Sequence, residues 1–232
     1  MALILNIDTS TKVCSVALGL DGKLLVLQES FTGHVHASQL NMVIETVLKQ
    51  ANHGFKDLTA VAISAGPGSY TGLRIGTSTC KGLCYALDIP LISVNTLKAL
   101  AWKVDSFFQD EKERLYVPMI DARRMEVYAA YYNNQMEQLV APHAWIVDKE
   151  QPKMNGLVEN KAVYYFGNGS KKCEPILSGE NVHFLNGMYC SAGNMVELAE
   201  IAHKQEQFVD TAYYEPFYLK KYIPLKSKKT LV

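Results

Sequence analysis

Two short segments hold residue types that could bind a phosphate group. The first is Asp8-Thr9-Ser10, a carboxylate followed by two hydroxyls, and the second is Asp121-Ala122-Arg123-Arg124. Carboxylates bind divalent cations, whereas hydroxyls, arginines and backbone amides bind phosphate. In the second segment, side chains replace the glycines that would let the backbone approach a phosphate closely. The sequence therefore predicts a weak phosphate or anion site, and leaves open that both aspartates bond backbone amides at strand ends.

A glycine-rich segment, SAGPGSYTGLRIG at residues 64–76, opens a predicted helix. A phosphate at the start of a helix uses only the backbone amides of the first turn. Small residues nevertheless recur further along, at Gly72, Gly76, Gly82 and Ala86. Each helical glycine costs about 1 kcal/mol relative to alanine, so this spacing predicts that another backbone packs closely on the helix. Packing on the chain's own sheet and packing on a partner both remain open.

Other catalytic chemistries have little support in the sequence. His34 and His36 lie two residues apart without a nearby acidic or sulfur ligand, so they do not predict a metal site. The chain has no Gly-x-Ser-x-Gly motif, and Ser69 is predicted to cap a helix rather than to act as a nucleophile. Cys80 and Cys84 are predicted to be core thiols. We therefore expect no catalytic residue and no bound metal.

The composition limits the location and the partners of the chain. Its 232 residues include 23 basic and 23 acidic side chains, so no net charge attracts nucleic acid or an anionic membrane. No apolar run reaches the roughly 20 residues that cross a bilayer, and the N-terminus does not read as a signal peptide. Five cysteines without Cys-x-x-Cys spacing indicate a reducing compartment. We expect a cytoplasmic protein that makes no membrane contact and meets RNA only locally or through a partner.

The hydrophobic pattern predicts an α/β protein with an internal duplication. Strands are predicted over 3–8, 13–19, 23–30, 60–64 and 89–94, and helices over 37–51 and 72–87. The second half begins in the same way, with a strand that ends in Asp121 and a turn at Asn133-Asn134. Asp8 precedes the turn at Asp21-Gly22 by the same distance, which indicates two copies of one three-stranded meander. A strand over 162–170 and a helix over 194–207 are predicted to follow.

A duplicated meander with an aspartate at the end of each first strand resembles the actin-like ATPase (ASKHA) superfamily. This resemblance implies two lobes, which we place at 1–105 and 106–232. The N-terminal lobe would carry the partner-binding helices, and the C-terminal lobe would be smaller and less regular. It also implies an alternative function, a small-molecule kinase or ATPase with Asp8 and Asp121 holding metal and phosphate in the cleft between the hairpin loops.

Four motifs in order resemble one family more closely: ILNIDTS, SAGPGSYTGLRIG, MIDARRMEVYAA and EPFYLKKY. They are similar to the bacterial TsaB family, formerly YeaZ. The resemblance implies a non-catalytic subunit in the synthesis of threonylcarbamoyladenosine (t6A) at position 37 of tRNAs that read codons beginning with A. It implies a heterodimer with the catalytic paralogue TsaD, contact with the ATPase TsaE, and tRNA binding only through the complex. A homodimer is expected for the chain alone, and ATP or ADP is expected only at the level of the complex.

TsaD carries two metal-binding histidines within Val-Asn-His-x-Glu-Gly-His. The equivalent stretch here is taken to be residues 94–100, VNTLKAL, which follows the predicted strand IPLIS. Thr96 and Leu100 then stand at the histidine positions, and Lys98 adds a cation where a metal would sit. Leucine cannot coordinate a metal, and the cation repels one. The resemblance therefore implies that the chain is not an enzyme by itself.

The resemblance also implies that the two predicted helices of the first lobe dock against TsaD. Met42 and Val43 lie off the apolar stripe of the first helix, so both are predicted to be exposed and available to a partner. A bulky side chain at Gly76 or Val43 is expected to abolish pairing and to leave the monomer folded. The predicted interface consists of His36, Leu40, Met42, Val43, Tyr70, Gly72, Arg74, Gly76, Thr79 and Lys81.

Overall fold

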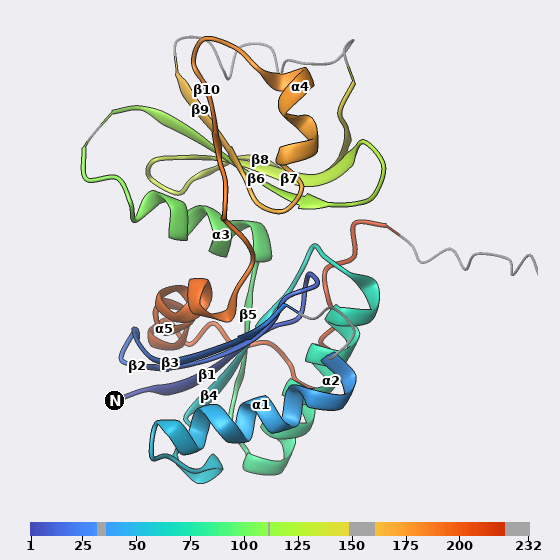
Figure 1. The fold of residues 1–232 in the computed structure, drawn as a ribbon. Coiled ribbons are helices and arrows are strands. Elements are labelled where there is room, and N and C mark those ends of the chain that lie inside the picture. Colours follow the sequence, from blue (N-terminus) through green and yellow to red (C-terminus); the bar gives the residue numbers. More distant parts are fainter. Residues whose placement is uncertain (32–35, 111, 149–160, 221–232) are drawn as a thin grey trace, which may run out of the picture.

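Two five-stranded sheets form the body of the protein in the computed structural model (Figure 1). The structure describes residues 1–31, 36–110, 112–148 and 161–220. The first sheet contains β1 (Leu3–Asp8), β2 (Cys14–Leu20), β3 (Lys23–Ser30), β4 (Ala60–Ser64) and β5 (Leu91–Val94). The second contains β6 (Arg114–Asp121), β7 (Glu126–Asn133), β8 (Gln138–Ile146), β9 (Ala162–Phe166) and β10 (Val182–Leu185). The α-helices are α1 (His36–Gln50), α2 (Tyr70–Leu87), α3 (Thr96–Asp105), α4 (Glu174–Leu177) and α5 (Val196–Lys204).

β1 lies at the centre of the first sheet, antiparallel to β2 and parallel to β4. All six of its residues are buried, because helices cover both faces of the sheet. Leu3, Leu5 and Ile7 pack with α1 and α2. Ala2 and Ile4 point the other way and pack with α5. A strand covered on both faces reads as a continuous apolar run, as LILNI does here.

The second sheet repeats the topology of the first. The strand order is β3-β2-β1-β4-β5 in one sheet and β8-β7-β6-β9-β10 in the other. In both, the two strands of the hairpin side are antiparallel to their neighbours and the remaining two are parallel. Asp8 and Asp121 end the equivalent strands β1 and β6. The predicted duplication of a meander is therefore confirmed.

The predicted boundaries are closer to the structure in the first half than in the second. β1, β3 and β4 match the predicted ranges, and β2, β5, α1 and α2 differ from theirs by at most two residues at either end. The helix α3 was not predicted. β9 ends at Phe166 rather than at residue 170, because Gly167 adopts a φ of +99° that an extended strand does not allow. α5 spans 196–204 rather than 194–207, since residues 192–195 form a 3-10 turn.

The last described residues return to the first sheet. α5 packs on the face of this sheet opposite α1 and α2, and α3 lies between the two sheets (Figure 1). Residues 208–220, which we name the C-terminal strap, then cross the first sheet. The backbone amides of Val209 and Phe217 donate to the carbonyls of Leu91 and Ala65, at 2.9 and 2.7 Å. The division into lobes at residue 105 remains a prediction.

Within the described residues, no helix combines the length and apolarity needed to cross a bilayer.

The second sheet buries a tyrosine hydroxyl that has no hydrogen-bond partner among the described residues. Tyr132 is 1% exposed, and burial raises the pKa of its hydroxyl. An unpartnered polar group loses its bonds to water on folding and gains nothing in return. We expect Tyr132→Phe to stabilise the chain by about 1 kcal/mol, measured as a higher midpoint in urea unfolding.

Tyr131→Phe is the matched control for this prediction. Tyr131 is equally buried, but its hydroxyl is hydrogen-bonded to Tyr165. Removing this hydroxyl is expected to lower the midpoint by the equivalent of about 1 kcal/mol. A lower midpoint for both variants would contradict the assignment of Tyr132 as unpartnered.

Candidate functional site

The first predicted phosphate loop is buried and bonded to the chain itself. Asp8 is 1% exposed, and its Oδ1 accepts hydrogen bonds from the backbone amide and the hydroxyl of Ser10, at 2.8 and 2.7 Å. Thr9 and Ser10 are fully buried, and the Thr9 hydroxyl donates to the Gly72 carbonyl at 2.8 Å. Asp8 therefore bonds a backbone amide at a strand end, as the alternative interpretation of the sequence has it.

The glycine-rich segment packs directly on this loop. A Cβ atom at Gly68 would lie 2.4 Å from the carbonyl oxygen of Ser10, and one at Gly72 would lie 2.1 Å from that of Thr9. A Cβ at Gly76 would lie 2.3 Å from the Thr9 hydroxyl. These glycines let α2 approach the chain's own loop, which is one of the two explanations that the sequence left open. The expectation that a bulky side chain at Gly76 spares the monomer is corrected by this contact.

The first turn of α2 is also occupied by the chain. Ser69 caps the helix as predicted, with its hydroxyl accepting from the Gly72 amide at 3.3 Å. The Ser69 amide donates to the Ser10 carbonyl at 2.6 Å, and the Leu73 amide donates to the Ser69 carbonyl. The Gly72 amide, one of the first-turn donors that a phosphate would use, therefore already has an acceptor.

Two thiols lie close enough to Asp8 to sense its charge. Burial and the negative charge of Asp8 raise the pKa of Cys14 to about 11, and the same two causes raise the pKa of Cys190. Both thiols stay protonated and uncharged at neutral pH. Cys80 and Cys84 are also buried, as the sequence predicts.

The second predicted loop is exposed, but its carboxylate is paired. Oδ1 of Asp121 accepts from the Arg123 amide at 2.9 Å and from the Lys172 ammonium. The Asp121 amide donates to the Asn168 side chain at 3.0 Å. Arg123 and Arg124 adopt φ angles of +73° and +47°, a left-handed conformation that costs roughly 1–2 kcal/mol per residue. The chain maintains this turn without a glycine.

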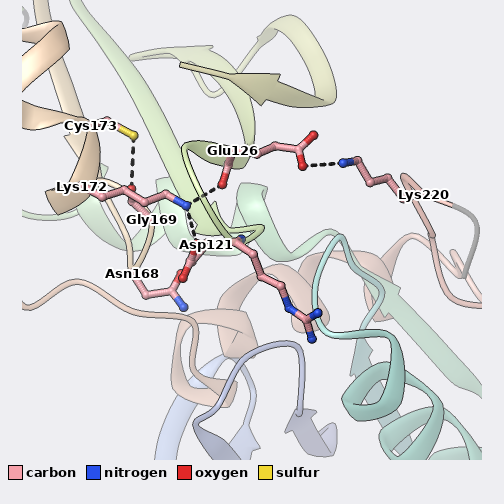
Figure 2. Close-up of polar contacts among 8 residues, drawn as sticks. Asp121, Glu126, Asn168, Gly169, Lys172, Cys173 and Lys220 are labelled. Atoms are coloured by element: carbon pink, nitrogen blue, oxygen red, sulfur yellow. Dashed lines mark hydrogen bonds and ion pairs between the residues drawn. The ribbon is translucent and has the colours of Figure 1, made fainter. Parts of the chain in front are cut away.

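Two lysines approach the β6–β7 hairpin from different elements (Figure 2). Lys172 follows β9, and its ammonium contacts Asp121 and donates to the Glu126 carbonyl at 2.6 Å. Lys220, in the C-terminal strap, pairs with the Glu126 carboxylate. The strap thereby connects the first sheet to the hairpin of the second.

The predicted interface residues on α1 differ in exposure. Leu40 is buried in the core of the first sheet, so it supports the fold rather than the surface. Val43 is half-buried against the same core, and it is less exposed than predicted. Met42 is 61% exposed, in agreement with the prediction. α1 begins at His36, whose side chain lies outside the described part of the structure.

Three predicted interface residues on α2 hold the C-terminal strap. Arg74 donates to the Tyr70 hydroxyl at 3.0 Å, and the rings of Tyr70 and Tyr218 lie 4.9 Å apart. The Lys81 ammonium donates to two strap carbonyls, at 2.9 and 3.2 Å. These side chains therefore already have partners within the chain.

A groove of about 480 Å³ separates α1 from α2. It is lined by Asn41, Ile44, Glu45, Phe55, Ser78, Thr79, Gly82 and Leu83. A Cβ at Gly82 would meet no atom within 4 Å, so this glycine leaves the surface open. Met42 and Tyr85, the latter 88% exposed, belong to the same two helices. The two helices thus offer a hollow with exposed apolar side chains near it.

Comparisons with known proteins assign the chain to a family. The family model for TsaD, described as tRNA N6-adenosine threonylcarbamoyltransferase, matches residues 30–227. A relative from Haemophilus influenzae, the tRNA threonylcarbamoyladenosine biosynthesis protein TsaB, is 28% identical over 96% of this chain and 95% of its own. The chain belongs to the TsaD-related TsaB (YeaZ) family. The TsaB of Bacillus subtilis is 33% identical, and this match spans 59% of each chain.

Solved structures agree with the TsaB family and with the fold. YeaZ from Pseudomonas aeruginosa has a TM-score of 0.78 at 27% identity, over 94% of this chain and 100% of that chain. The activator of the 2-hydroxyisocaproyl-CoA dehydratase from Clostridium difficile, with bound ADPNP, has a TM-score of 0.50 at 8% identity, over 88% and 96%. The latter likeness shows the fold alone. The predicted actin-like fold and the predicted family are both confirmed.

In this TsaB chain, the two residues that the sequence predicts to stand at the TsaD histidine positions have structural contacts. Thr96 is buried, and its hydroxyl accepts from the Gly66 amide at 3.0 Å and lies 3.1 Å from the Ser64 hydroxyl. Leu100 is 1% exposed in the core beneath the second sheet. Across the described residues, no three His, Cys, Asp or Glu side chains are grouped as metal ligands.

Sequence reasoning missed the two lysines and the asparagine that surround the second loop. Lys172 and Asn168 follow β9, far from Asp121 in the sequence, and no local pattern links them. Lys220 lies in the EPFYLKKY motif that supported the family resemblance. The motif marked this position, but nothing in the sequence predicted its contact with the hairpin.

Substitutions at two glycines of α2 test whether the helix packs on the first loop. Gly72→Ala places a methyl group against the Thr9 carbonyl, so we expect a loss of about 1–3 kcal/mol in unfolding free energy. Gly82→Ala is the matched control, because its methyl group meets open space and alanine favours the helix by about 1 kcal/mol. Urea unfolding should give midpoints that move in opposite directions. Equal midpoints would contradict the packing described here.

Proposed function

We propose that the chain is a non-catalytic subunit of the system that threonylcarbamoylates adenosine 37 of tRNA. Membership of the TsaB family supports this assignment, because the relatives in that family carry the name of threonylcarbamoyladenosine biosynthesis proteins. In this role, the chain pairs with a TsaD-type paralogue, and a TsaE-type ATPase joins the complex. It binds tRNA through the complex and does not hold a nucleotide firmly by itself. Without its partner it can pair with a second copy through the same surface.

The state of the two hairpin loops is the observation that carries the non-catalytic assignment. Asp8 is buried and bonded to Ser10, and Asp121 is paired with Lys172. The alternative, a kinase or ATPase, needs these two carboxylates to hold metal and phosphate. Both are bonded instead to donors within the chain, and Thr96 and Leu100 cannot replace a histidine pair. The contribution of the chain is then binding energy that favours the active conformation of its partner.

The face formed by α1 and α2 is the proposed surface for the TsaD-type paralogue. It combines the groove at Thr79 and Gly82 with the exposed side chains of Met42 and Tyr85. An open glycine beside exposed apolar residues suits the close approach of another helix. Gly72 and Gly76 support this surface from within rather than forming it.

Two substitutions on this face test the proposed pairing. We expect Met42→Glu and Gly82→Gln to weaken the mixed dimer with the TsaD-type paralogue of the same organism by about tenfold or more, since each adds charge or bulk to an apolar contact. The mass of the complex, measured by light scattering over a concentration series, reports the affinity. Ile146→Glu is the matched control, because Ile146 is 63% exposed but lies on β8 of the second sheet.

Unchanged pairing in both variants would contradict the assignment of this face. Loss of pairing in the Ile146→Glu control as well would show that the effect is not specific to α1 and α2. The absence of any mixed dimer with the wild-type chain would contradict the proposed function.

The kinase alternative predicts a different result. We expect the purified chain to show no ATP hydrolysis above a no-protein blank, because the hairpin carboxylates are occupied. A phosphate-release assay with and without Mg²⁺ measures this directly. Hydrolysis that is lost on Asp121→Asn would restore the alternative.

A further inference from the structure

The β6–β7 hairpin carries two cations that no described residue neutralises. Arg123 and Arg124 are exposed, and neither guanidinium has a hydrogen bond or ion pair among the described residues. The nearest acidic residues of the hairpin are already used, since Asp121 pairs with Lys172 and Glu126 pairs with Lys220. An anion that reaches this turn therefore meets two free guanidinium groups.

The backbone conformation of this turn disfavours arginine, so the presence of two arginines needs an explanation. Both residues adopt positive φ angles, which glycine and asparagine accept far more readily. Turn positions with positive φ are dominated by glycine, asparagine and aspartate. The position therefore keeps arginine where another residue would fold more easily, and no contact within the described chain explains it. A contact with a group outside the chain would explain it.

Further polar groups converge near Arg123. The positive charges of Lys220 and Arg123 both act to lower the pKa of the Tyr128 hydroxyl, although burial raises it on balance. The tyrosine hydroxyl and the two cations are therefore near neighbours. Lys220 reaches the same hairpin from the C-terminal strap, but its charge is paired with Glu126 (Figure 2). The unpaired positive charge of this patch therefore comes from Arg123 and Arg124.

The shape of this patch favours a polymer over a small molecule. Arg123 and Arg124 are at an exposed hairpin turn. The grooves identified between α1 and α2 and beside β10 are lined by other residues, so neither encloses the arginines. Small ligands bind in concave sites that bury most of their surface. A phosphodiester backbone needs only exposed cations along its path.

We propose that Arg123 and Arg124 form a phosphate-binding site through which this subunit contacts the tRNA backbone in the assembled complex. The inference rests on the proposed function and deepens it, because it gives the subunit its own contact with the substrate. It also narrows the phosphate site predicted from sequence. Asp8, Thr9 and Ser10 are buried and Asp121 is paired, which leaves the two arginines.

The test uses the full chain in complex with the TsaD-type paralogue and an unmodified tRNA transcript that reads codons beginning with A. Arg123→Gln/Arg124→Gln is expected to weaken tRNA binding about tenfold in low salt, measured by fluorescence anisotropy. The slope of log Kd against log salt concentration should fall by about 1–2, as expected for one or two lost phosphate contacts. Lys23→Gln/Lys112→Gln is the control, because it removes the same charge from exposed positions elsewhere.

A second variant separates binding from folding. Arg123→Gly/Arg124→Gly suits the left-handed backbone, so the urea midpoint should not fall, yet tRNA binding should weaken as in the glutamine variant. Light scattering on every variant establishes that the mixed complex still forms. Competition of ATP or inorganic phosphate with tRNA for the wild-type patch, lost in the glutamine variant, would assign the site to small phosphates and overturn the tRNA assignment.

The outcomes distinguish this inference from the function on which it rests. If the wild-type chain pairs with its partner and both arginine variants bind tRNA like wild type, the inference is wrong and the proposed function stands. If the lysine control loses as much affinity as the arginine variants, the effect is general charge and the inference is also wrong. If no mixed complex forms with the wild-type chain, the proposed function itself fails.

Discussion

The contact between the first loop and the start of α2 sets the geometry of the first half of the molecule. Thr9 and Ser10 meet backbone atoms at Gly68, Gly72 and Gly76, and at these positions any side chain would collide with the loop. Because α2 lies this close, the Thr9 hydroxyl donates to the Gly72 carbonyl and the Ser10 carbonyl accepts from the Ser69 amide. The loop that the sequence predicts as a phosphate-binding element is here a packing element. The surface that α2 shares with α1 is held in place by the same contact.

In the second half, the equivalent aspartate, Asp121, is bonded by a lysine side chain from elsewhere in the chain as well as by a nearby backbone amide. Its hairpin keeps an exposed carboxylate, and Lys172 supplies the compensating charge from a different part of the chain. The strap adds Lys220 from the side of the first sheet, so the hairpin is connected to both halves. The two copies of the duplicated unit therefore share a topology but differ in chemistry: Asp8 is buried and bonded to uncharged groups, whereas Asp121 is exposed and paired with a lysine.

The sequence was sufficient for the two meanders and the fold class because the relevant signals are local, but it did not predict α3, α4 or β10. Apolar runs, the Asp21-Gly22 turn and the repeated distance from aspartate to turn predict both meanders, and the predicted start of α2 at residue 72 lies two residues from the observed start at Tyr70. The candidate site was harder, because its contacts join residues far apart in the chain. No sequence pattern near Asp121 predicts its contact with Lys172, and none near Gly76 predicts its contact with Thr9. Helical spacing predicts that another backbone packs on the glycines, but only the structure shows that this backbone is the chain's own loop at Thr9 and Ser10.

The return of α5 to the first sheet has a consequence for how the protein is made on the ribosome. One face of that sheet is covered by α1 and α2, which are translated soon after β1, but Ile4 on the other face is covered by residues of α5. Every strand of the second sheet lies between β5 and α5 in the chain. The first half therefore cannot bury its second apolar face until the second half has left the exit tunnel, and the nascent chain carries that face uncovered in the meantime. The first sheet, although synthesised first, therefore buries its second face only after α5, the last helix, has been synthesised.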